Sequence, residues 1–166
     1  RERLRMETLE RQRHALVREV HHRIKNSLQG VVGLLQLHAR ERPGMEEPIR
    51  AAIARVNSVA AVHGLYAGGD GGGVRLCDIV DAIGAYERNL FPEIELRIER
   101  PGDWREVRLD ERESVAVALV ISELALNAIK ACVRERCKVP VMIAFERVDE
   151  AVCVTVSNAA GRLPEG

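Results

Sequence analysis

The sequence predicts an α+β protein in which a long helical hairpin precedes a smaller part that mixes helices and strands. Through residues 1–67, apolar residues recur at steps of three, four and seven, the spacing of amphipathic helices. After a glycine-rich run at 68–73, helical spacing is mixed with the alternation typical of strands. The glycine run indicates a flexible break, so we expect two domains, 1–67 and 74–166.

The composition is typical of a folded protein that has no large excess of positive or negative charge. Hydrophobic residues make up 46% of the chain, and 25 Lys and Arg balance 25 Asp and Glu. Because there is no overall positive charge, we expect neither nucleic acid nor a membrane surface as a partner. No apolar run approaches the ~20 residues that a membrane span needs. The four cysteines form no CxxC pair, so we expect reduced thiols in a cytoplasmic protein.

The first forty residues predict one long amphipathic helix. They contain no proline, and Arg42-Pro43-Gly44 ends the pattern before Pro48 opens a second one. The apolar stripe of the first helix comprises Leu9, Leu16, Val20, Ile24, Val31 and Leu35. A hairpin of two amphipathic helices cannot cover its own stripe, so we expect two copies to pair into a four-helix bundle. The sequence therefore predicts a homodimer.

The second part predicts helices set against a sheet. The pattern is helical at 74–89, alternating at 93–99, strongly apolar at 114–133, and strand-like at 139–146 and 151–156. The glycine run before it is not a phosphate-binding loop, because no Gly-Lys-Ser/Thr follows it and no strand precedes it.

His22 is the candidate reactive residue of the first helix. At about 100° per residue it lies roughly 175° from the centre of the apolar stripe, so it should face solvent. His21 lies only about 75° from that centre and should be a flank or dimer-interface residue. The face of His22 also carries charged and amide side chains: Arg18, Glu19, Lys25 and Asn26.

Chemistry allows such a face to receive a phosphoryl group. A neutral imidazole is a competent nucleophile near pH 7, and Glu19 could orient the ring or accept its proton. The alternative is that His22 is simply a solvated residue, as exposed histidines on charged helix faces usually are.

The segment Glu19-Val20-His21-His22-Arg23-Ile24-Lys25-Asn26-Ser27-Leu28-Gln29 resembles the phosphoacceptor box of sensor histidine kinases of the HisKA_2 and HWE classes, whose core is H-R-hydrophobic-K-N. In that box the acceptor precedes the arginine, which makes it His22 here, supported by Arg23, Lys25 and Asn26. The segment Val62-His63-Gly64-Leu65-Tyr66 is similar to the family's second bundle helix.

A second candidate site lies in the apolar segment at 114–133. Glu123, Asn127 and Lys130 are spaced i, i+4 and i+7, which places them within about 60° on a helix. The bland interpretation is an ordinary solvent-facing strip. Because the flanking residues are so apolar, however, we expect both sides of this helix to be covered and the polar side chains to have partners.

The segment Ser122-Glu123-Leu124-Ala125-Leu126-Asn127-Ala128-Ile129-Lys130 resembles the N box of GHKL-type ATP-binding domains. The resemblance implies that Asn127 holds Mg²⁺ through ATP, that Lys130 contacts the phosphates, and that Glu123 handles a proton or polarises the attacking group. Ala131 stands where the family often has histidine.

The segment at 154–164 occupies the place of the family's first glycine box. Asn158 replaces the aspartate that recognises adenine, and Ala160 and Arg162 replace glycines. The chain ends at Gly166, before the lid and the second glycine-rich box. We therefore expect only part of a GHKL domain, an ATP site that is incomplete in this chain, and a longer parent kinase.

The resemblance implies a kinase that autophosphorylates His22 from Mg-ATP and transfers the phosphoryl group to the receiver domain of a response regulator, under an upstream sensor domain. The alternative is an ATP-independent phosphotransfer or docking module with a degenerate nucleotide domain. A third possibility, a GHKL protein that phosphorylates or sequesters a partner, is disfavoured by the His-Arg-Ile-Lys-Asn box.

Overall fold

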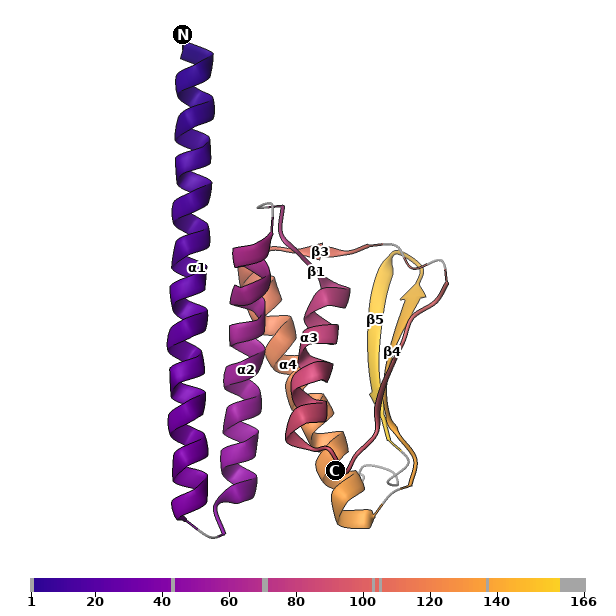
Figure 1. Ribbon diagram of the computed structural model, residues 1–166. Helices are drawn as coiled ribbons and strands as arrows, with labels where there is room; N and C mark the ends of the chain where they lie inside the picture. Colours follow the sequence, from indigo (N-terminus) through magenta and orange to yellow (C-terminus); the bar gives the residue numbers. More distant parts are fainter. Residues whose placement is uncertain are drawn as a thin grey trace.

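The computed structural model describes residues 2–42, 44–69, 72–102, 104, 106–136 and 138–158, and it has the predicted α+β architecture (Figure 1). Helices α1 (Glu2–Glu41) and α2 (Glu46–Gly68) form the hairpin. The elements that follow are β1 (Val74–Arg75), α3 (Leu76–Leu90), β2 (Leu96–Glu99), β3 (Arg108–Leu109), α4 (Glu111–Glu135), β4 (Val141–Val148) and β5 (Ala151–Ser157). The predicted fold class is confirmed.

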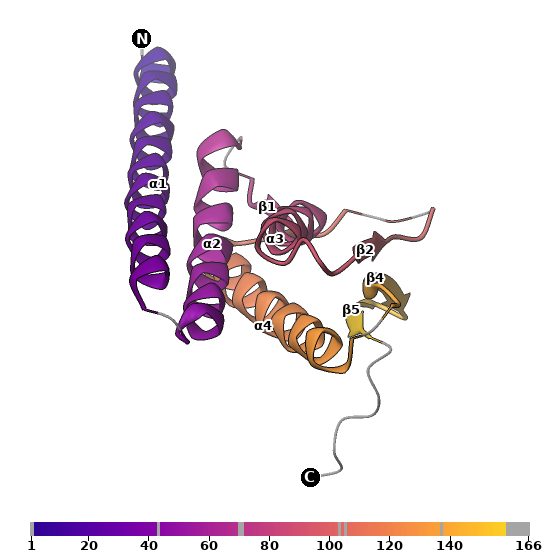
Figure 2. The same ribbon diagram turned by 60° about the horizontal axis from the view of Figure 1, so that its bottom comes forward.

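Helix α2 lies between α1 on one side and α3 and α4 on the other (Figures 1 and 2). Its sequence allows this because small side chains occur on both sides of the helix and let neighbouring helices approach closely. The alanines that are buried in α2 are Ala51, Ala54, Ala60, Ala61 and Ala67. Helix α1 extends well beyond the end of α2 in Figure 1.

Only part of the predicted stripe of α1 is covered within the chain. The side that packs on α2 carries the buried His21 and the half-buried Leu28, Val32 and Leu35. Among the residues of α1 whose burial the structure describes, the exposed large apolar ones are Met6, Leu9, Leu16, Val17, Val20, Val31, Leu34 and Leu37. An apolar surface about a quarter-turn away from α2 therefore remains open.

The sheet of the second part has the strand order β2-β4-β5, with β2 parallel and β5 antiparallel to β4. Val141, Ile143 and Phe145 alternate along β4 and are buried in the core, as the strand pattern predicts. The strand predicted at 93–99 begins only at Leu96, because Pro92 opens a turn in which the Ile94 amide donates to the Phe91 carbonyl at 3.1 Å.

A single hydrophobic core extends across the predicted domain boundary. It joins Ala54 and Val62 of α2 to Ile79 and Ile83 of α3, and continues into α4 and β4. The division into 1–67 and 74–166 stays a prediction, and Asp70 and Gly71 of the linker lie outside the described residues.

Helix α4 corrects one expectation from composition. A window of this helix has a mean hydropathy of 1.8, so by length and composition it is apolar enough to cross a membrane. Such a helix is also what a protein core needs, and residues including Ala118, Ala125, Leu126 and Ile129 of α4 are buried in the core. The three described cysteines, Cys77, Cys132 and Cys153, are thiols, and Cys137 lies outside the described residues.

The last glycine of the predicted flexible run is tightly placed. Gly73 has a φ of +84°, and a Cβ added there would lie 2.7 Å from the backbone oxygen of Leu109. We expect Gly73→Ala to lower the free energy of unfolding by about 1–3 kcal/mol in urea denaturation. Gly68→Ala is the matched control, because a Cβ there meets nothing within 4 Å. Equal stability of the two variants would mean that position 73 tolerates a side chain, contrary to this expectation.

A buried carboxyl group makes stability depend on pH. Burial raises the pKa of Glu87 to about 7, against a weaker opposing effect of the hydrogen bond from Ser122 Oγ, and the Glu87 side chain is only 1% exposed. The unfolded chain therefore loses this proton at lower pH than the folded chain does. We expect the free energy of unfolding to fall by up to about 3 kcal/mol between pH 5 and 8.

Glu87→Gln should remove this part of the pH dependence, measured by denaturation at several pH values. Glu99→Gln, on an exposed side chain, should leave it in place. The assignment is wrong if the Glu87→Gln and wild-type curves keep the same slope over this range.

Candidate functional site

His22 is exposed on α1, as the helical geometry predicts. One turn earlier, Glu19 accepts a hydrogen bond of 2.8 Å from the Arg23 Nε. This bond and the charge of Arg23 hold the pKa of Glu19 below its usual range. Glu19 is thus a stable carboxylate that suits orienting the ring or countering positive charge on it better than it suits accepting a proton.

The other residues predicted to assist His22 differ in their exposure. Asn26 and Arg23 are exposed, whereas Lys25 is half-buried. The Lys25 stem lies against Gly64 of α2, where an added Cβ would meet Lys25 Cδ at 3.3 Å. Lys25 therefore leans towards the second helix instead of standing on the open face beside His22, because the missing side chain of Gly64 leaves room for its stem.

The sequence left open whether His21 is a flank or a dimer-interface residue, and the structure places it against α2. His21 is buried within the chain, where its Nδ1 lies 2.9 Å from the Nδ1 of His63 on α2. Its ring also stacks on Tyr66, with centroids 5.1 Å apart. Burial, and then the neighbouring His21, lower the pKa of His63. The helical wheel gave the angle of His21 correctly but could not show that α2 lies on that side.

The three residues of the second predicted site lie on α4 and face two different environments. Asn127 is exposed, while Glu123 receives hydrogen bonds of 2.9 and 3.1 Å from Arg55 of α2. Lys130 Nζ lies 3.4 Å from a carboxylate oxygen of Glu47 at the start of α2. The expectation of partners is met for Glu123 and Lys130 by these ion pairs with the hairpin.

The expectation that both sides of this helix are covered is wrong. Leu119, Val120, Leu124 and Val133 stay exposed on α4 within the described part of the chain. The buried side of α4 is instead used against α2, α3 and the sheet.

Asn158 is brought to the same helix. Its amide Nδ2 donates to the backbone oxygen of Ala128 at 3.0 Å, so the residue after β5 lies beside the C-terminal half of α4. A cavity of about 740 Å³ opens near the end of α4 and is lined by Lys130, Arg134, Glu47 and Arg50, among others. Ala160 and Arg162 of the predicted glycine box lie outside the described residues.

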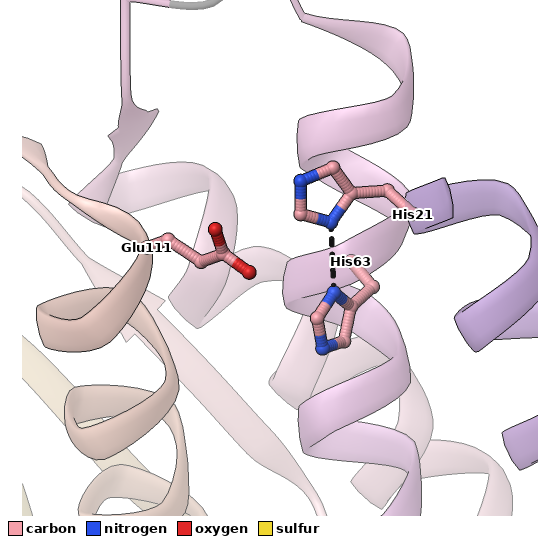
Figure 3. A group of neighbouring side chains, drawn as sticks. All are labelled: His21, His63 and Glu111. Atoms are coloured by element: carbon pink, nitrogen blue, oxygen red, sulfur yellow. Dashed lines mark hydrogen bonds between the residues drawn. The ribbon is translucent and has the colours of Figure 1, made fainter. Parts of the chain in front are cut away.

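The structure does not bring the two candidate sites together. His22 is exposed on α1, and α2 lies between α1 and α4 (Figures 1 and 2). The residues that sequence reasoning missed are the partners on α2, Arg55 and Glu47, and Glu111 at the first turn of α4, which approaches His21 and His63 (Figure 3). The sequence analysis named His63 only as part of the segment that is similar to the family's second bundle helix.

Comparison with known proteins agrees with the acceptor box. Residues 19–90 match the family model HisKA_2, described as a histidine kinase. This region of the chain is a HisKA_2 histidine kinase region. It begins at Glu19, contains His22 and all of α2, and continues to the end of α3, so it crosses the glycine-rich run.

The curated relatives are sensor histidine kinases named PdtaS. The protein of Mycobacterium tuberculosis strain H37Rv is 36% identical over 119 residues, which cover 70% of this chain and 23% of the relative. The protein of Mycolicibacterium smegmatis is 34% identical over 145 residues, 86% of this chain and 26% of the relative. The chain thus spans about a quarter of the length of these relatives. No solved structure matches it significantly.

Proposed function

We propose that this chain is the core of a two-component sensor histidine kinase in which His22 accepts the γ-phosphoryl group of ATP and passes it to an aspartate of a response-regulator receiver domain. The observation that carries the proposal is the exposed His22 directly before Arg23 within the HisKA_2 region. The sensor histidine kinase names of the relatives support it. The chain would act in the cytoplasm, joined to an upstream sensor domain.

In the proposed reaction a neutral ring nitrogen of His22 forms a P–N bond while the bond from the γ-phosphorus to the ADP oxygen breaks. ADP leaves, and the ring becomes positively charged until it loses a proton. The Glu19 carboxylate, one turn away and held ionised by Arg23, would counter that charge. The exposed position of the ring allows both a nucleotide and a receiver domain to reach it.

We assign the nucleotide contacts to α4 and the residue after β5. The exposed Asn127 offers an amide oxygen, a ligand type that fits Mg²⁺, and Lys130 stands at the 740 Å³ cavity as a phosphate contact. Bound Mg²⁺ would neutralise phosphate charge. Asn158 lies beside Ala128, which is on the same helix as Asn127 and Lys130. Its amide oxygen would accept a hydrogen bond from the adenine amino group. Glu123 would polarise the attacking group once Arg55 releases it.

This assignment implies a change of arrangement during the reaction. Since α2 separates His22 from α4, and since Glu123 and Lys130 are paired with Arg55 and Glu47, α4 must leave its place on α2 before a nucleotide bound there can meet His22 of the same chain. The ion pairs are half-exposed and so add little to the stability of this arrangement, which the shared core of α2, α3 and α4 maintains.

We further propose that a second copy of the chain covers the open apolar surface of α1. Within this surface Leu16 and Leu34 are 68% and 61% exposed, which is unusual for large apolar residues on one helix face. A parallel hairpin from a partner would bury it in a four-helix bundle.

The first test of the kinase is phosphorylation of the protein in its longest natural form by γ-labelled ATP and Mg²⁺. We expect acid-labile label in the wild type, with loss of nearly all label in His22→Ala and Asn127→Ala. His38→Ala, which removes another exposed histidine of α1, should keep the label. Label that comes only from a phosphorylated regulator would favour the ATP-independent module, and label kept in His22→Ala would exclude His22 as the acceptor.

The dimer has a separate test. Leu16→Asp combined with Val20→Asp should place two charges in the bundle core and convert the dimer to monomers, as measured by light scattering after size-exclusion chromatography. Gln29→Asp, on the opposite exposed face, should remain dimeric. A wild-type protein that is monomeric at micromolar concentration contradicts the proposal.

A further inference from the structure

Three helices bring metal-ligand side chains to one point of the molecule. His21 comes from α1, His63 from α2 and Glu111 from the first turn of α4, and one ligand atom of each lies within 4.8 Å of those of the other two. Figure 3 shows the Glu111 carboxylate directed towards the two rings. We call these residues the His-His-Glu cluster.

We propose that the His-His-Glu cluster binds one borderline divalent cation, of the class of Zn²⁺. Two histidines and one glutamate, with water as the fourth ligand, form a known tetrahedral set for this ion. Neither the kinase reaction nor the dimer uses these three side chains in the roles assigned above.

The spacing fits one ion with small side-chain movements. Ligand atoms around a tetrahedral Zn²⁺ at about 2.0–2.1 Å are about 3.3 Å apart. The two Nδ1 atoms at 2.9 Å are slightly closer than this, and Glu111, whose side chain is exposed, has the freedom to approach. The rings themselves are fixed by burial, with exposed fractions of 4% for His21 and 8% for His63.

The surroundings hold the cluster in position, as the outer contacts of metal sites do. Tyr66 stacks on His21 and donates from its hydroxyl to the backbone oxygen of Leu109 at 3.1 Å, which joins α2 to the end of β3, two residues before α4. Asp110 and Glu113 form a capping box that fixes the first turn of α4 and with it the position of Glu111.

An entry path is present. A cavity of about 460 Å³ beside the cluster is lined by His21, Tyr66 and Glu111 and by basic residues of α1: Arg11, Arg13, His14 and Arg18. These basic side chains are exposed, so water and salt screen their repulsion of a cation, while the Glu111 carboxylate offsets charge directly at the ion.

A bound ion would join the hairpin to α4. The helix that carries Glu123, Asn127 and Lys130 would then be fastened to α1 at the residue next to His22. Metal binding would therefore hold α4 away from His22 and slow phosphorylation; this consequence rests on the proposed function, whereas the metal site does not.

The test uses the metal alone, without nucleotide. We expect the chelator-treated wild type to bind one equivalent of Zn²⁺ at the cluster in a calorimetric titration. Glu111→Gln should lose this equivalent or bind it about 100-fold more weakly. Co²⁺ should give the absorption bands of a tetrahedral site in the wild type, and Zn²⁺ should raise the melting temperature. His63→Gln should behave like Glu111→Gln.

His38→Gln is the matched control, since it removes an exposed histidine of the same helix that bonds to the backbone oxygen of Leu34. Glu111 is exposed and outside the capping-box bonds, so Glu111→Gln decides the question even if His63→Gln does not fold. Unchanged Zn²⁺ binding in Glu111→Gln, or no binding by the wild type at about 100 μM, overturns the proposal. Because no ATP is present, loss of kinase activity leaves the result unaffected.

Discussion

The packing of α2 on both of its sides is the constraint on which the rest of the structure depends. A helix that is covered by α1 on one side and by α3 and α4 on the other must carry small residues on both, and its buried alanines meet that need. Ala54 and Val62 then belong to the same core as Ile79, Ile83 and Phe145. The hairpin and the α/β part are therefore one packed body in this structure, with Arg55 and Glu47 aligned towards α4.

Local patterns in the sequence carry most of the fold. Proline-free helical spacing predicts α1, Pro48 marks the first turn of α2, and alternation predicts β4 and β5. Patterns of one element do not tell which element covers which face, and that is where the predictions fail. The stripe of α1 was correctly located, yet α2 packs beside its centre; the apolar residues of α4 do not all find cover within the described part of the chain.

The candidate sites likewise contain features that one element determines and features that depend on contacts between distant elements. The exposure of His22 follows from helix geometry alone, since it depends only on residues of α1. The surroundings of His21, Glu123 and Asn158 depend on pairs 42, 68 and 30 residues apart, which periodicity cannot relate. The family resemblance marked His22, Asn127 and Lys130 because motifs preserve chemistry, but it carries no information on Arg55, Glu47 or Glu111, which set the present arrangement of α4 against the hairpin.

The unbroken course of α1 has a mechanical consequence. Between Glu2 and His22 there is neither glycine nor proline, and the part of α1 beyond α2 touches no other helix along its outer turns in Figure 1. The roughly 30 Å of helix between Glu2 and His22 is therefore stiff, and its N-terminal turns lie away from the packed body. A rotation of the first turns about the helix axis is therefore transmitted along α1. It would change the direction in which the His22 ring faces.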